Sequence, residues 1–156
     1  MTSKVRVSRF VKTGYGVVEI ATNSLIVFAS FYFLFYMTEA LGVPPLYAGL
    51  LFFVAKTFDV ITDPLIGNWS DRTNTAMGRR RPFMLAGGIL LGPMVALMFL
   101  APFVNQESWV LSALYFMGFT MATYLALTLI SVPGGAMTAE MTDDYNERTN
   151  ITAWRW

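Results

Sequence analysis

The stretch Lys56-Thr-Phe-Asp59-Val-Ile-Thr-Asp63-Pro64 lies in the middle of an otherwise apolar segment, residues 46–68. Asp59 and Asp63 are four residues apart, so on a helix they share one face, and Lys56 lies one turn earlier on nearly the same side. A carboxylate at membrane depth is costly unless it is paired or faces water. The acidic pair therefore predicts a site for a cation or a proton, and Pro64 adds a free backbone oxygen because it has no N–H to donate.

The chemistry of this pair leaves alternatives open. Two carboxylates together with hydroxyl, carbonyl and water oxygens suit a hard cation such as Na⁺ or Li⁺. Lys56 would compete with Na⁺ and favour a proton instead. A purely structural ion pair between Lys56 and the aspartates, without any role in transport, is the plain alternative.

The composition is that of a membrane protein. Of the 156 residues, 55% are hydrophobic and only 13% are charged. Apolar stretches of about 20 residues indicate membrane-spanning helices. The chain has no Cys and no His, and it shows no nucleophile–base pair, zinc-ligand spacing or phosphate-binding glycine loop. The sequence therefore predicts no enzyme, no cofactor and no nucleic-acid partner.

The apolar stretches divide the chain into helices and connections. The pattern predicts an all-α integral membrane protein with helices at about 14–38, 46–68, 82–103 and 109–133. Residues 1–13 form the N-terminal lead-in, and residues 134–156 form a loop and the start of a further helix. Gly87, Gly88 and Gly92 are expected to let the third helix approach a neighbour closely.

The basic residues predict the orientation of these helices. If four helices alternate, all but Lys56 fall on one side of the membrane: Lys4, Arg6, Arg9, Lys12, Arg72, Arg79, Arg80, Arg81, Arg148 and Arg155. Since basic residues gather on the cytoplasmic side, both termini and the middle loop are predicted to be cytoplasmic.

Polar side chains within the first and fourth helices are candidates for substrate binding. Glu19 and Asn23 lie four residues apart on the first helix, and their oxygens could orient sugar hydroxyls. An interhelical polar contact is the alternative for both residues. Thr128 and Ser131 lie on the fourth helix, where hydroxyls often bond to their own backbone.

Two motifs resemble a known family. The loop Gly67-Asn-Trp-Ser-Asp71-Arg72, followed by Gly78-Arg-Arg-Arg-Pro82, is similar to the signature loop of major facilitator transporters. Together with residues 59–67 and 132–149, it resembles the glycoside–pentoside–hexuronide:cation symporters, the group of the melibiose permease.

The resemblance implies a twelve-helix transporter, of which this chain would be an N-terminal fragment holding four helices and the start of a fifth. It places the coupling ion, Na⁺, Li⁺ or H⁺, at Asp59 and Asp63, with Thr128 nearby. It places substrate at Asn23 and Ser131, where the melibiose permease has aspartates, and Glu19 would supply the missing acid from one turn away.

The charged loops are expected to form a lock that closes the cytoplasmic side and breaks when the transporter opens inward. Its members are Asp71, Arg72, Arg79, Arg80 and Arg81, with Glu140 and Arg148 opposite. A positive-inside anchor with solvated loops is the alternative for these residues.

The predicted function is cation- or proton-coupled symport of a sugar or glycoside by alternating access. The protein would be a multi-pass protein of the inner or plasma membrane. Its partners would be lipids, substrate, the coupling cation, and the remaining helices of the same transporter or another chain. A carrier of lipids or other amphiphiles and a non-transporting four-helix membrane partner remain as alternatives.

Overall fold

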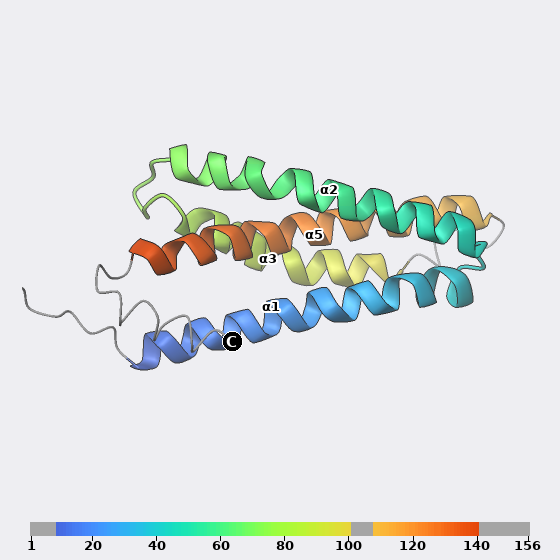
Figure 1. Ribbon diagram of the computed structural model, residues 1–156, viewed down its shortest axis with the longest axis horizontal. Coiled ribbons are helices and arrows are strands. Elements are labelled where there is room, and N and C mark those ends of the chain that lie inside the picture. The colour runs from blue at the N-terminus through green and yellow to red at the C-terminus, as the bar shows by residue number, and fades with distance from the viewer. Residues whose placement is uncertain (1–8, 101–107, 141–156) are drawn as a thin grey trace, which may run out of the picture.

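The computed structural model describes residues 9–100 and 108–140, and in this part of the chain all regular secondary structure is helical. The elements are α1 (Arg9–Phe35), the π-helical turn η1 (Tyr36–Ala40), α2 (Pro45–Arg72), α3 (Arg81–Met98) and α5 (Trp109–Glu140). The long helices run side by side along the length of the molecule (Figure 1).

Glycine and proline set the turns between these helices. Gly42 has a φ of +64° and Gly78 a φ of +98°, a region that side chains rarely adopt. Pro45 begins α2 and Pro82 lies in the first turn of α3, positions where a missing N–H costs no hydrogen bond. The Thr75 hydroxyl closes the second turn by donating to the Gly78 carbonyl at 2.6 Å.

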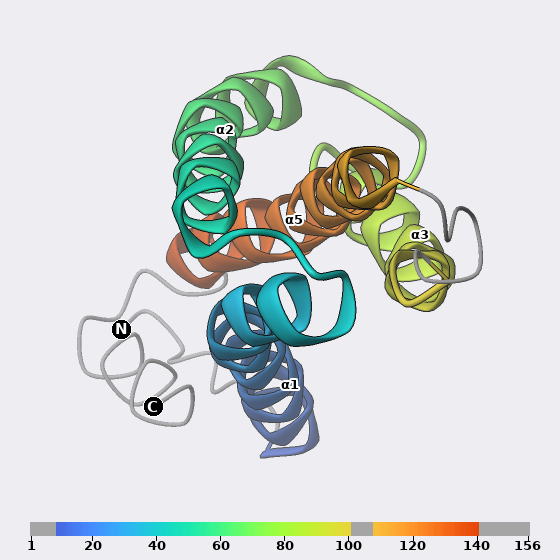
Figure 2. The same cartoon turned by 90° about the vertical axis from the view of Figure 1, so that its right-hand side faces the viewer.

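Helix α5 is the centre of the bundle and lies between α2 and α3 (Figure 2). It contributes to three buried apolar clusters that follow one another along its length. Phe116 packs with the end of α1 and the start of α2, Tyr124 and Leu127 pack around Ala55, and Leu129 packs with Ile66 and Phe83. Because α5 contacts the other helices along its length, its packing determines which sides of α1 and α2 point into the bundle.

Gly87 is the point of closest approach between α3 and α5. A Cβ atom at this position would lie 2.6 Å from the Ala126 carbonyl oxygen and 2.8 Å from Ile130 Cγ1. The predicted close-packing role is therefore confirmed for Gly87. It is wrong for Gly88 and Gly92, since a Cβ at either would meet nothing within 4 Å.

Within the described ranges, three stretches are long and apolar enough to cross a membrane: Gly16–Ala40, Arg81–Met98 and Trp109–Met137. Helix α2 has 28 residues but is not among them. Lys56, Asp59 and Asp63 lie near its middle and lower its hydropathy.

The helices differ from the predicted ranges mainly at their ends. Helix α2 continues past residue 68 to Arg72, so Asp71 and Arg72 lie in its last turn and not in the loop. Helix α5 continues through Pro133 to Glu140, so residues 134–140 are not the expected loop. Packing sustains this extension beyond the proline, since Gly134 lies against Met84 of α3. The expected start of a further helix lies outside the described residues.

Candidate functional site

The acidic face of α2 meets α5. Thr128 of α5 donates a hydrogen bond from its hydroxyl to Oδ1 of Asp63 at 2.9 Å. Thr128 is buried, whereas Asp63 is exposed. The structure therefore brings together Asp63 and Thr128, which were predicted as members of one ion site.

One turn earlier on α2, Lys56 Nζ lies 3.6 Å from Oδ2 of Asp59. The side chains of Lys56 and Asp59 remain 30% and 26% exposed, so this ion pair is only partly withdrawn from solvent. The same ammonium lies 4.2 Å from the centre of the Tyr124 ring on α5. The predicted ion pair between Lys56 and the aspartates is thus formed, and its acidic partner is Asp59.

The oxygens around this face suit a hard monovalent cation. Asp59 and Asp63 supply carboxylates. The Thr128 oxygen keeps its lone pairs while the hydroxyl donates its hydrogen bond to Asp63. Pro64 lies inside α2 and leaves the carbonyl of Val60 without its usual helical donor. No group of three or more His, Cys, Asp or Glu occurs within residues 9–100 and 108–140, so neutral oxygens would have to complete any coordination shell.

A separate cavity of about 290 Å³ lies between α1, α3 and α5. Glu19 and Ser131 both line it, together with Thr22, Met84 and Ile130. Its volume is at the lower end of ligand pockets, about 300–1,000 Å³. The structure therefore joins two of the three predicted substrate residues in one cavity.

Asn23, the third predicted substrate residue, does not line this cavity, and it is exposed. Four residues on a helix turn by about 400°, so Asn23 is rotated by about 40° from Glu19. This rotation places Asn23 outside the cavity that Glu19 lines.

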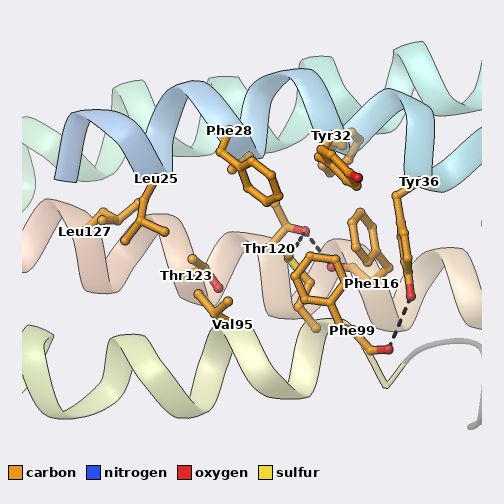
Figure 3. Close-up of a pocket in the computed structure, with 13 residues that line it drawn as sticks. Leu25, Phe28, Tyr32, Tyr36, Val95, Phe99, Phe116, Thr120, Thr123 and Leu127 are labelled. Carbon is orange, nitrogen blue, oxygen red and sulfur yellow. Dashed lines mark hydrogen bonds between the residues drawn. The ribbon is translucent and has the colours of Figure 1, made fainter. Parts of the chain in front are cut away.

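A second, smaller cavity of about 60 Å³ lies further along α1 and is almost wholly apolar (Figure 3). Its lining includes Phe28, Tyr32, Tyr36 and Phe116, and the Tyr36 hydroxyl donates to the Phe99 carbonyl at 3.2 Å. The hydroxyls of Thr120 and Thr123 donate to carbonyls of their own helix at 2.7 and 2.8 Å. This cavity therefore offers few polar groups to a sugar.

Two residues of the predicted lock, Asp71 and Arg80, form an ion pair. Arg80 donates from Nη2 to Oδ1 of Asp71 at 2.8 Å and from Nε at 3.3 Å, which joins the end of α2 to the start of α3. Arg72, Arg79 and Arg81 lie on the exposed surface nearby.

The two residues predicted to lie opposite the charged loop, Glu140 and Arg148, cannot be placed. The backbone of Glu140 ends α5, but its side chain lies outside the described residues, as does all of Arg148.

Tyr124 lies at the candidate site, although the sequence did not predict it there. It lies four residues before Thr128 on α5, the spacing that also separates Asp59 from Asp63 on α2. Its ring contacts Lys56, and no spacing in the sequence singles it out, because periodicity does not give the face of α5 that meets α2.

Comparison with known proteins identifies the family. A family model described as MFS/sugar transport protein matches residues 14–156. The chain belongs to this family of the major facilitator superfamily. Its long apolar helices agree with an integral membrane protein.

Several similar proteins are symporters by name. An uncharacterised symporter of Synechocystis is 38% identical over 130 residues, which cover 81% of this chain and 24% of the relative. The inner membrane symporter YicJ of Escherichia coli is 29% identical over 145 residues, covering 93% of this chain and 31% of the relative.

A candidate glycoside/cation symporter of Escherichia coli is 33% identical over 149 residues, which cover 93% of this chain and 31% of that protein. The chain thus spans about a quarter to a third of the length of the curated relatives it matches.

Proposed function

We propose that the protein is a secondary active transporter that couples entry of a sugar or glycoside to a cation, Na⁺, Li⁺ or H⁺. The observation that carries this proposal is the hydrogen bond between Thr128 and Asp63, which joins a buried hydroxyl of α5 to a carboxylate within α2. A neutral donor on one helix and a carboxylate pair on another form the kind of oxygen-rich site that a hard cation prefers.

The coupling ion would bind between α2 and α5, at Asp59, Asp63 and Thr128. The sugar would bind at the cavity that Glu19 and Ser131 share, with a carboxylate and a hydroxyl to orient its own hydroxyls. Both sites use α5, since Thr128 and Ser131 lie three residues apart on it. Binding at one site can therefore alter the affinity of the other. By linkage, the ion would raise the affinity for sugar by the same factor by which sugar raises the affinity for the ion.

The membrane arrangement belongs to the same proposal. All four long helices would span the bilayer, α2 with its charged face turned toward the protein interior, and both termini would be cytoplasmic. The relatives are about three to four times longer than the aligned region, which supports a site completed by further helices of a twelve-helix bundle. Apart from the coupling ion, this scheme needs no cofactor.

An amphiphile is the second candidate substrate. The small cavity in Figure 3, about 60 Å³ in volume, is lined by aromatic and aliphatic side chains, and such a surface suits the end of an acyl chain better than a sugar.

The proposal is tested by uptake into proteoliposomes that contain the protein expressed from its whole gene. Radiolabelled methyl glycosides and free hexoses are supplied with an inward gradient of Na⁺, Li⁺ or H⁺, and with choline chloride as the reference. We expect one cation gradient to raise uptake at least tenfold and Asp63→Asn to abolish that increase. Glu39→Gln, which removes an exposed carboxylate in η1, is the control and should leave the increase unchanged. Equal uptake in all gradients would contradict the coupling, and uptake of amphiphiles alone would favour the second candidate.

A further inference from the structure

The ammonium group of Lys56 lies between two partners on different helices. It is 3.6 Å from Oδ2 of Asp59 on its own helix and 4.2 Å from the centre of the Tyr124 ring on α5. An ammonium over an aromatic face is attracted by the ring, and the attraction strengthens as water is removed. Lys56 is therefore held at Asp59 from two sides.

Tyr124 contributes its ring to this arrangement and not its hydroxyl. The side chain is 1% exposed, in a cluster with Ala55 and Leu127. Its hydroxyl has no hydrogen-bond partner among the described residues. A buried hydroxyl without a partner gives no stabilisation that would explain a tyrosine here. The buried ring of Tyr124 therefore provides Lys56 with a fixed aromatic face.

The two aspartates of α2 are therefore not equivalent. Asp59 faces a cation that the protein itself supplies, whereas Asp63 accepts a hydrogen bond from the neutral Thr128. Ala55, fully buried against Tyr124, leaves room for α5 to come close to α2 at this level. On α5, Tyr124 thus contacts Lys56, and Thr128 donates to Asp63 one turn further along the helix.

We propose that Lys56 is a tethered cation that occupies Asp59 in the empty carrier, and that Tyr124 is the positioning residue that holds it there. This inference rests on the proposed cation coupling. A coupling ion that binds both carboxylates must remove the ammonium from Asp59, because two positive charges on one carboxylate repel each other. The strength of the contact between Lys56 and Tyr124 therefore lowers the affinity for the coupling ion.

The first test observes Lys56 directly in the protein expressed from its whole gene. Lysines are methylated with ¹³C formaldehyde, and the Lys56 signal is assigned by its loss in Lys56→Gln. We expect the ring current of the aromatic side chain to displace this signal to high field in the parent and in Tyr124→Phe. In Tyr124→Leu it should return to the position of a solvated lysine. A Lys56 signal at the solvated position in the parent would overturn the inference.

The second test adds the ion. Na⁺, Li⁺ and H⁺ are titrated separately against choline chloride at constant ionic strength, and one of them is expected to move the Lys56 signal toward the solvated position. Tyr124→Leu should lower the dissociation constant of that ion by about twofold to fivefold, the factor that an ordinary cation–π contact represents. Tyr124→Phe should leave it unchanged, and Lys56→Gln should lower it at least as far as Tyr124→Leu.

The double variant separates positioning from packing. Once Lys56→Gln has removed the ammonium, Tyr124→Leu should have no further effect on the dissociation constant. An equal shift in both backgrounds, or a Tyr124→Phe variant that behaves like Tyr124→Leu, would overturn the role of the ring. If Tyr124→Leu does not fold, ring fluorination of Tyr124→Phe weakens the attraction at nearly constant shape and replaces it.

The tethered cation and the proposed coupled transport can fail independently of each other. Cation-driven uptake without any movement of the Lys56 signal would overturn the tethered cation and leave the coupled transporter standing. Movement of the signal with the dissociation constants described, but without cation-driven uptake, would support the tethered cation and contradict the coupled transport.

Discussion

The Thr128 hydroxyl and the Asp63 carboxylate are joined by a hydrogen bond of 2.9 Å that links α5 to α2. Thr128 is 2% exposed and fixed within the central helix, whereas Asp63 is exposed on its own helix. A buried neutral donor thus orients a carboxylate that an ion can still reach. This relationship is the structural basis for the proposed ion site, and it gives the first prediction.

Thr128→Val removes the hydroxyl at nearly constant volume. A hydrogen bond to a charged group contributes about 1.5–3 kcal/mol, so we expect the affinity for the coupling ion to fall by about tenfold to a hundredfold. Ion binding measured by isothermal titration calorimetry checks this value. Thr128→Ser should retain most of the affinity. Thr123→Val is the matched control, because the Thr123 hydroxyl donates to the Phe119 carbonyl of its own helix. A loss in Thr123→Val as large as in Thr128→Val would contradict the role of Thr128.

The cavity between α1, α3 and α5 sorts the predicted substrate residues. Glu19 and Ser131 line it, and Asn23 does not. A charged hydrogen bond to a substrate hydroxyl contributes about 1.5–3 kcal/mol, so Glu19→Gln should raise the KM for sugar by about tenfold or more. Ser131→Ala should raise it by a smaller factor. Asn23→Ala should change it less than twofold in the same uptake assay. An effect at Asn23 larger than at Glu19 would show that the sugar lies elsewhere.

Gly87 and Gly88 form a matched pair of neighbouring glycines for testing the contact between α3 and α5. Gly87→Ala places a Cβ 2.6 Å from the Ala126 carbonyl, and overpacking of this kind costs about 1–3 kcal/mol. We expect a lower Tm for the detergent-solubilised protein, followed by fluorescence-detected size-exclusion chromatography after heating. Gly88→Ala meets nothing within 4 Å and should leave the Tm unchanged or raise it slightly, since alanine favours the helix. Equal loss in both variants would refute the close approach at Gly87.

The ion pair between Asp71 and Arg80 is a test of the charge lock. Because the Asp71 side chain is 56% exposed, the pair should contribute only about 0.5–1 kcal/mol. Asp71→Arg and Arg80→Asp should each slow uptake, and the doubly exchanged variant should recover part of the rate. Glu39→Gln, which removes an exposed charge outside the predicted lock, is the control. A double variant no faster than either single one would show that the pair is not a lock.

The sequence alone was sufficient for the helical membrane class and for the acidic pair. A run of apolar residues long enough to span a bilayer has few alternatives to a helix, because lipid offers no partners to backbone polar groups. The spacing of Asp59 and Asp63 then places both carboxylates on one face without any knowledge of the neighbouring helices. The family resemblance, which the comparison confirmed, added Thr128 and Ser131 through motif positions that periodicity alone does not single out.

The rotation of one helix against another was decided only by the tertiary structure. Periodicity fixes the angle between side chains on the same helix, but the face that meets a neighbour depends on which small residues allow close approach. Gly87 against Ala126 sets α3 on α5, and Ala55 against Tyr124 sets α2 on α5. That packing selected Tyr124 to face Lys56, which no local pattern in the sequence required.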